Sequence, residues 1–164
     1  MSSAADTLPV LIEFYGEKLA ETLTHQAHAR EVSQYDANNT YQYIINREEV
    51  QLTWLATAIT DGGGVLPDVG ASTTVPPGKS KSAAQGFFAD DLKGTQAFLE
   101  RWRPRVEALD NARHRLMLGV ILGETREQQR FFEQALAGRT DLLGRRSSAG
   151  APAMGVVLPA RWIE

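Results

Sequence analysis

The chain of 164 residues contains no cysteine, which excludes disulfide bonds, thiolate metal ligands and cysteine nucleophiles. It also lacks an excess of positive charge: the net charge is −3, and no basic run is interleaved with aromatic residues. No apolar stretch reaches membrane-spanning length, and the N-terminus lacks the pattern of a secretory signal. These absences predict a cytoplasmic protein that binds neither nucleic acid nor a membrane.

The apolar residues make up 43% of the chain, enough for one domain with a real core, and their spacing is helical. It predicts four helices, at residues 7–33, 40–60, 86–109 and 111–137. Thr7 is a plausible N-cap, and the segment YDANNT reads as a tight turn between the first two helices. Pro104 lies inside the third predicted helix, so we expect that helix to be kinked or divided.

Residues 62–85 are rich in Gly, Pro, Ser and Thr, which interrupts the helical pattern. A flexible linker is one interpretation, and a crossover along the length of a helical bundle is the other. We predict an all-α, up-down four-helix bundle over residues 1–137, with a long connection between its second and third helices. Residues 138–164 form a C-terminal extension. Its apolar end is expected to lie extended against the body or a neighbouring subunit, and it contains Val156, Val157, Leu158 and Trp162.

Two predicted helices each carry a glutamate in an apolar stripe. On a helical wheel of about 100° per residue, Glu48 lies near the centre of the stripe that contains Ile44 and Leu55. Glu124 lines up with Ile121 and Phe131 in the same way. A carboxylate in such a position is costly unless it is neutralised, paired or bound to a cation. The two residues therefore predict a shared polar layer in the middle of the bundle.

The segment EEVQLTWLATAI followed by GGGVLPD resembles the second helix and exit of bacterioferritin and rubrerythrin-type proteins, and VILGETREQQRFFEQAL resembles their fourth helix. This resemblance implies a ferritin-like fold and a di-metal carboxylate site that holds iron or manganese. In that family each of these helices carries a Glu-x-x-His motif, but here the histidine positions hold Gln51 and Glu127. The implied metal ligands are Glu48, Glu124 and Glu127, and no catalytic residue is assigned.

Three states of this site remain open: a complete di-metal centre, a single hard ion held by the glutamates and water, and a relic polar layer. In the relic layer the glutamates would bond to Gln51, Gln128, Tyr15 or Tyr41, or pair with Arg103. Without a metal, close approach of Glu48 and Glu124 would raise the pKa of at least one of them, and Glu48→Gln would be neutral or stabilising. On the third helix, Asp91 and Glu100 are candidate ligands that lie off the predicted stripe.

His25 and His28 have a spacing that metal ligands on a helix can use. They lie opposite the stripe formed by Leu19 and Leu23, so we expect an exposed polar face, with a surface or interface metal site as the alternative.

Two functions from different classes follow. The first is a ferritin-like binding or structural module, homodimeric and non-catalytic, with an incomplete metal site and no bound metal. The second is a carboxylate-bridged di-iron or di-manganese oxidoreductase, or an iron-handling protein, that uses Glu48 and Glu124. The missing histidines favour the first function, and the presence of both glutamates favours the second. Whether the protein is an enzyme is left open.

Overall fold

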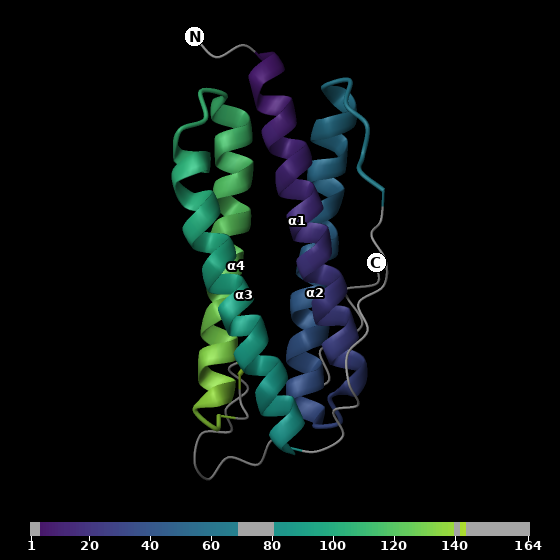
Figure 1. Cartoon of the computed structure of the whole chain (residues 1–164), viewed down its shortest axis with the longest axis vertical. Helices are drawn as coiled ribbons and strands as arrows, with labels where there is room; N and C mark the ends of the chain where they lie inside the picture. The colour runs from purple at the N-terminus through teal and green to yellow at the C-terminus, as the bar shows by residue number, and fades with distance from the viewer. Residues whose placement is uncertain (1–3, 69–80, 140–141, 144–164) are drawn as a thin grey trace, which may run out of the picture.

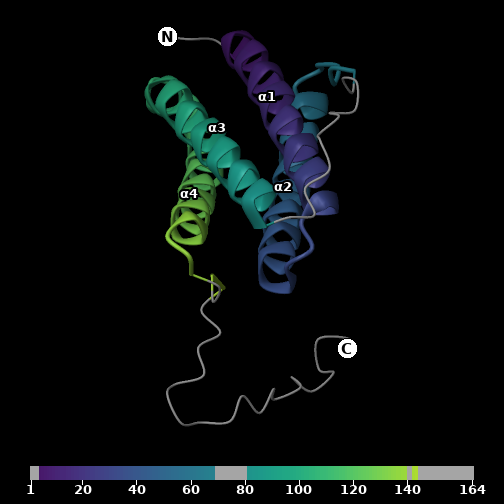
Figure 2. The same cartoon turned by 60° about the horizontal axis from the view of Figure 1, so that its bottom comes forward.

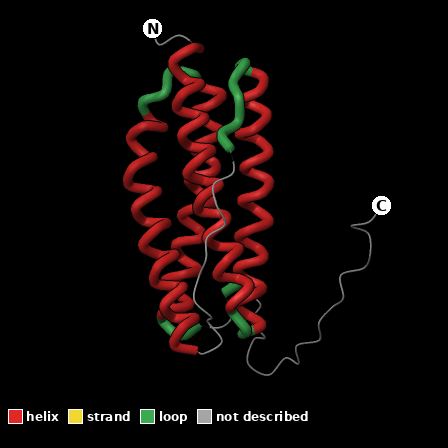
Figure 3. Tube along the Cα trace, turned by 45° about the vertical axis from the view of Figure 1, so that its right-hand side comes forward, coloured by secondary structure: helices red, strands yellow, loops and turns green. Residues whose placement is uncertain are grey.

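The computed structural model describes residues 4–68, 81–139 and 142–143, and these residues form four helices and no strand (Figure 1, Figure 3). The helices are α1 (Ala4–Glu31), α2 (Tyr35–Asp61), α3 (Lys81–Glu107) and α4 (Ala112–Leu136). The predicted all-α class is confirmed. None of the described helices combines the length and the apolar character that crossing a bilayer requires.

The helices form two hairpins, α1 with α2 and α3 with α4, which face each other through α1–α3 and α2–α4 contacts (Figure 2). A bond from Gln26 to Glu49 joins α1 to α2, and the pair Glu13–Arg105 joins α1 to α3. Residues early in α1 meet residues late in α3, and the reverse holds at the other end, so α3 is antiparallel to α1. Since α2 is also antiparallel to α1, α2 ends and α3 begins at opposite ends of the bundle (Figure 1).

The connection between α2 and α3 is described only over residues 62–68. Residues 69–80, the middle of the predicted crossover, lie outside the described residues. The described part leaves α2 at a glycine-rich turn in which Gly63 has a φ of 79°. Such a left-handed conformation suits a residue without a Cβ atom, so this Gly run ends α2 as the sequence predicted.

Two helix boundaries differ from their predictions. The second helix starts at Tyr35, inside the predicted turn, because Gln34 already acts as its N-cap and Asn38 donates a hydrogen bond to the Ala29 carbonyl oxygen at 2.9 Å. The third helix starts at Lys81, and it is one continuous helix through Pro104. Because Pro104 lies in the last turn, it removes only one hydrogen bond close to where the helix ends anyway.

The buried apolar residues form two clusters, one toward each end of the bundle. The first cluster joins the end of α1 and start of α2 to the start of α3 and end of α4, and Tyr41, Ile44, Phe88 and Phe132 are among its members. The second occupies the opposite end and includes Phe14, Leu55, Trp102, Leu118 and Ile121. The middle of all four helices is therefore left to other side chains.

The chain after α4 is described only in part. Leu142 is buried in the first cluster, and Leu143 packs against it. The predicted docking of the apolar C-terminal run stays a prediction, because residues 144–164, Trp162 included, lie outside the described residues.

Candidate functional site

A layer of polar side chains separates the two apolar clusters, and all four helices contribute to it. Its members are almost completely shielded from solvent, although several carry charge. A polar layer in the middle of the bundle was predicted from the sequence, but its membership differs from the prediction. We define the polar layer by its buried residues: Lys18, Thr22, His25, Glu48, Gln51, Asp91, Thr95, Thr125 and Gln128.

The predicted exposure of His25 and His28 is wrong, since both side chains are buried. Leu19 and Leu23, which defined the expected core face, are only half-buried. Burial along α1 recurs every three or four residues, as at the inner seam of a helical bundle, and the seam passes through both histidines and Lys18. The buried seam of α1 contains Leu11, Phe14, Lys18, Thr22, His25, His28 and Val32.

Lys18 is the internal cation of the layer. Its ammonium group lies 2.9 Å from Glu21 Oε2, 3.3 Å from Glu48 Oε1 and 3.3 Å from the hydroxyl oxygen of Thr125. Burial lowers the pKa of Lys18, but the neighbouring carboxylates of Glu21 and Glu48 outweigh it and raise the pKa above its ordinary value. Lys18 is therefore charged at neutral pH, with no exposed side-chain surface.

Glu48 is the central carboxylate, and it is fully buried as predicted. The Nδ1 atom of His25 lies 3.0 Å from each of its oxygens, and Lys18 approaches one of them. Burial alone would raise the pKa of Glu48, but the charges of His25 and Lys18 lower it below its ordinary value. The layer thus stabilises Glu48 as a carboxylate.

His25 lies between two carboxylates. Nδ1 faces Glu48, and Nε2 lies 3.8 Å from Asp91 Oδ1, which is longer than a hydrogen bond. Burial opposes a charge on the ring, but Glu48, Asp91 and Glu21 together raise the pKa of His25 to about 9. The buried ring is therefore an imidazolium at neutral pH and the second protein cation of the layer.

Asp91 connects the layer to the first apolar cluster. Its Oδ2 atom accepts hydrogen bonds from the Tyr41 hydroxyl and, at 2.8 Å, from Nδ1 of His28. Burial first, and then the charge of Asp91, raise the pKa of Tyr41, so the phenol keeps its proton. Asp91 was expected to lie off the core stripe, but it is buried. The seam of α3 follows Phe87, Asp91 and Thr95, and the wheel position used for the prediction was displaced from it.

Glu124 lies at the edge of the layer rather than in the seam, and its side chain is 19% exposed. Thr125 occupies the buried position instead. Glu124 accepts hydrogen bonds from Arg47 and Gln51. The bond to Gln51 agrees with the predicted relic layer, whereas the arginine partner is Arg47 and not Arg103.

The candidate metal ligands Glu48, Glu124 and Glu127 are placed in three different environments: Glu48 is buried, Glu124 is half-buried and Glu127 is exposed. Protein donors already occupy both oxygens of Glu48 and both of Glu124. Within the described part of the chain, no group of three or more His, Asp and Glu side chains is arranged to hold a metal ion. The donor set therefore does not fit a di-metal centre, and metal binding by these residues stays a prediction.

Several buried polar atoms of the layer region have no hydrogen-bond partner among the described residues. They are Oε1 of Glu21, Oε1 of Gln51 and both amide atoms of Gln128. Leaving such groups unsatisfied costs on the order of 1–3 kcal/mol each. The lysine and histidine of the layer are fully engaged, so the unsatisfied groups are concentrated on its glutamate and glutamine side chains.

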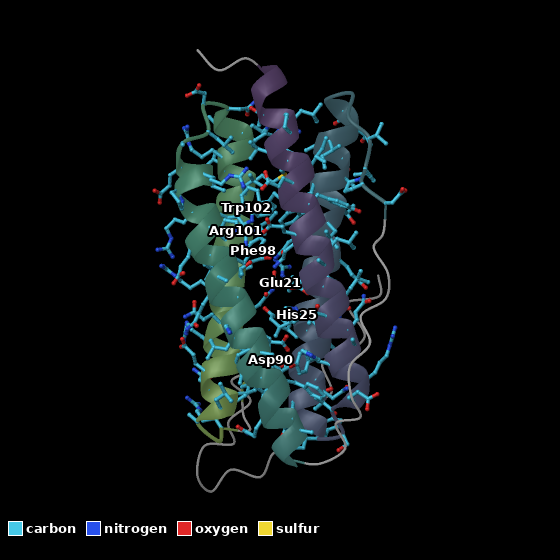
Figure 4. All side chains as sticks on the ribbon, viewed as in Figure 1. Glu21, His25, Asp90, Phe98, Arg101 and Trp102 are labelled. Carbon is cyan, nitrogen blue, oxygen red and sulfur yellow. The ribbon has the colours of Figure 1, made fainter. Side chains whose placement is uncertain are left out.

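A surface pocket of about 410 Å³ lies between α1 and α3 beside the polar layer. His25 and Asp91 line it from the layer, and Phe98 adds an aromatic ring. Figure 4 shows Glu21 and His25 on α1 facing the side of α3 that carries Asp90, Phe98 and Arg101. The pocket gives the surface a connection to the charged interior.

Comparisons of the chain with protein-family models, curated proteins and solved structures find no match. Function is therefore inferred from the geometry of the polar layer and of the pocket beside it.

Proposed function

We propose that this chain is a ferritin-like helical bundle whose central carboxylates are neutralised by its own cations, so that it serves as a non-catalytic binding or structural module. The observation that carries the proposal is the position of the Lys18 ammonium group, 3.3 Å from Glu48 Oε1 and 2.9 Å from Glu21 Oε2. In a di-metal protein a metal cation would balance carboxylates of this kind.

The helix directions support the ferritin-like part of the proposal. A bundle of two hairpins with parallel second and third helices needs one long connection, which is the arrangement typical of ferritin-like folds. The family motifs also correspond to matching levels of α2 and α4, since Gln51 of the first motif bonds to Glu124 of the second.

Charge supports the non-catalytic part. Lys18 and His25 are both cations at neutral pH, because Glu48 and its neighbours raise their pKa values. A divalent ion at Glu48 would lie within a few ångströms of both positive charges, and the repulsion would be strong in a buried site. The alternative, an oxidoreductase that uses Glu48 and Glu124, requires Lys18 and His25 to release Glu48 first.

Metal analysis tests this proposal. The full chain is produced in medium supplemented with iron and manganese, purified without chelators and assayed for metal by mass spectrometry. We expect far less than one iron or manganese per chain. About two tightly bound ions per chain, lost on substitution Glu48→Gln but retained in the exposed-site control Glu127→Gln, would establish the oxidoreductase alternative instead.

A further inference from the structure

We propose that the pocket between α1 and α3 binds a small organic ammonium ion, with its charged end at the acidic wall and its apolar body on Phe98. This inference rests on the proposed role as a binding module and names the ligand class. The pocket, about 410 Å³ in volume, is large enough for a ligand of roughly ten non-hydrogen atoms.

The apolar side of the pocket is built from small residues around one ring. Ala20 on α1 and Gly94 and Ala97 on α3 leave the space between the helices open, and Phe98 lies beside them. The Phe98 ring already has an ammonium neighbour, since its centroid is 5.1 Å from Lys18 Nζ. Aromatic rings attract alkylammonium groups in this way, and the ring also offers a surface for an apolar ligand body.

The polar side of the pocket carries carboxylates whose charge is incompletely balanced. Glu21, Asp90 and Asp91 all line it. Asp90 is exposed and forms no ion pair with another described residue, whereas the one arginine of the pocket, Arg101, is paired with Glu17 at 2.6 Å. His25, the other cation of the pocket, is held by Glu48.

Glu21 provides the independent indication of a ligand. Its Oε2 atom bonds to Lys18, but its Oε1 atom is shielded from solvent and has no partner among the described residues. Because Oε1 makes no hydrogen bond, a small movement of the carboxylate toward the pocket sacrifices none. An ammonium donor in the pocket would supply the missing partner, and it would also be attracted by Asp90. An anionic ligand would meet these carboxylates, so it is disfavoured.

Benzylamine is a suitable probe, because it combines an ammonium group with an aromatic body of the right size, and benzyl alcohol is its uncharged counterpart. Both are titrated into the full-length protein at pH 7, and binding is followed by amide chemical shifts in NMR spectra. We expect saturable binding of benzylamine, at least tenfold tighter than that of benzyl alcohol. The substitutions Glu21→Gln and Asp90→Asn should each weaken benzylamine binding at least threefold.

A pair of glycine variants locates the site. A Cβ atom at Gly94 or at Gly86 meets no other atom within 4 Å, so a leucine fits at either position of α3. Gly94 lines the pocket and Gly86 does not. We expect Gly94→Leu to abolish benzylamine binding and Gly86→Leu to leave it unchanged.

Three results would overturn the inference: equal affinity for benzylamine and benzyl alcohol, unchanged binding in Gly94→Leu, or displacement of benzylamine by millimolar Mg²⁺ with the Mg²⁺ bound more tightly. The first two would show an apolar or remote site, and the third would show a metal site. The outcome is separate from that of the proposed function. A metal-loaded protein that still binds benzylamine contradicts the metal-free module alone, and a metal-free protein that ignores benzylamine contradicts this inference alone.

Discussion

Lys18 Nζ lies 3.3 Å from Glu48 Oε1 in the middle of the bundle, and neither side chain has surface exposed to solvent. Two isolated charges in such a place would be prohibitively costly, and each is tolerated because the other is present. The layer therefore depends on completeness: removing one partner leaves a buried charge, whereas removing both leaves a space that apolar groups can fill.

The substitution Lys18→Met should lower the free energy of unfolding by about 3–5 kcal/mol, because it leaves Glu48 with only His25 as a cationic partner. Urea denaturation at pH 7 measures the loss. The control is Arg105→Met, which breaks the solvent-exposed pair with Glu13 and should cost no more than about 1 kcal/mol. Similar losses in the two variants would show that the buried pair has no special role.

The substitution Glu48→Gln provides a second test, because the sequence alone predicted it to be neutral or stabilising. That expectation assumed that Glu48 faces Glu124, whereas the structure places Lys18 and His25 against it. We now expect a loss of several kcal/mol, since two buried cations would lose their common carboxylate. The same urea denaturation decides between the two expectations, and a neutral effect would argue against the ion pairs.

The pH dependence of stability should report His25. The folded chain holds a proton on His25 up to a pKa of about 9, whereas the unfolded chain releases it near 6.5. This contribution is complete below about pH 6.5 and is lost as the pH rises to about 9, which amounts to roughly 3 kcal/mol. Thermal or urea unfolding across this range measures the slope.

The variant His25→Gln is the control for this slope, because it keeps the other titrating groups. His114 contributes with the opposite sign, since burial and the charge of Arg113 lower its pKa, and its share is lost at acidic pH instead. If the wild-type protein and His25→Gln show the same fall in stability between pH 6.5 and 9, His25 is not the buried imidazolium described here.

Much of the fold could be predicted from the sequence. The helix count, the polar layer and the burial of Glu48 follow from apolar spacing. Glu124 was misplaced because a wheel of 3.6 residues per turn drifts from the seam of a bundle, which follows 3.5. Thr125, one position further, takes the buried place, and a single residue displaces the inferred face by about 100°.

The cations of the layer could not be found in that way, because apolar residues were used to define the core face of the first helix. Lys18, His25 and His28 were counted as polar surface, although their spacing from Leu11 and Phe14 continues the seam. A charged residue at a seam position becomes informative only when its partners on other helices are known. The pairing of Lys18 with Glu48 depends on tertiary contact, so local sequence cannot supply it.

Glycine substitutions should separate close packing from open helix surface. A Cβ atom at Gly64 would lie 2.8 Å from Leu8 Cδ1 and 2.9 Å from Ile59 Cγ2, so Gly64→Ala should destabilise the protein by about 1–3 kcal/mol. At Gly119, inside α4, a Cβ atom meets nothing within 4 Å, and Gly119→Ala should stabilise by about 0.5–1 kcal/mol. Thermal unfolding of the two variants should give shifts of opposite sign; equal shifts would contradict the packing around Gly64.

Gln128 offers the clearest case in which a polar core residue can be replaced with benefit. Its side chain is buried, and neither its amide nitrogen nor its amide oxygen has a partner among the described residues. Replacing it with methionine, which has a similar shape, removes two unsatisfied groups and should be neutral or stabilising by about 1–3 kcal/mol. Gln51→Met is the matched control, because the Gln51 amide donates to Glu124 and its loss should destabilise. Urea denaturation of both variants measures the difference, and a clear loss of stability in Gln128→Met would show that Gln128 binds a buried water molecule or ligand inside the layer.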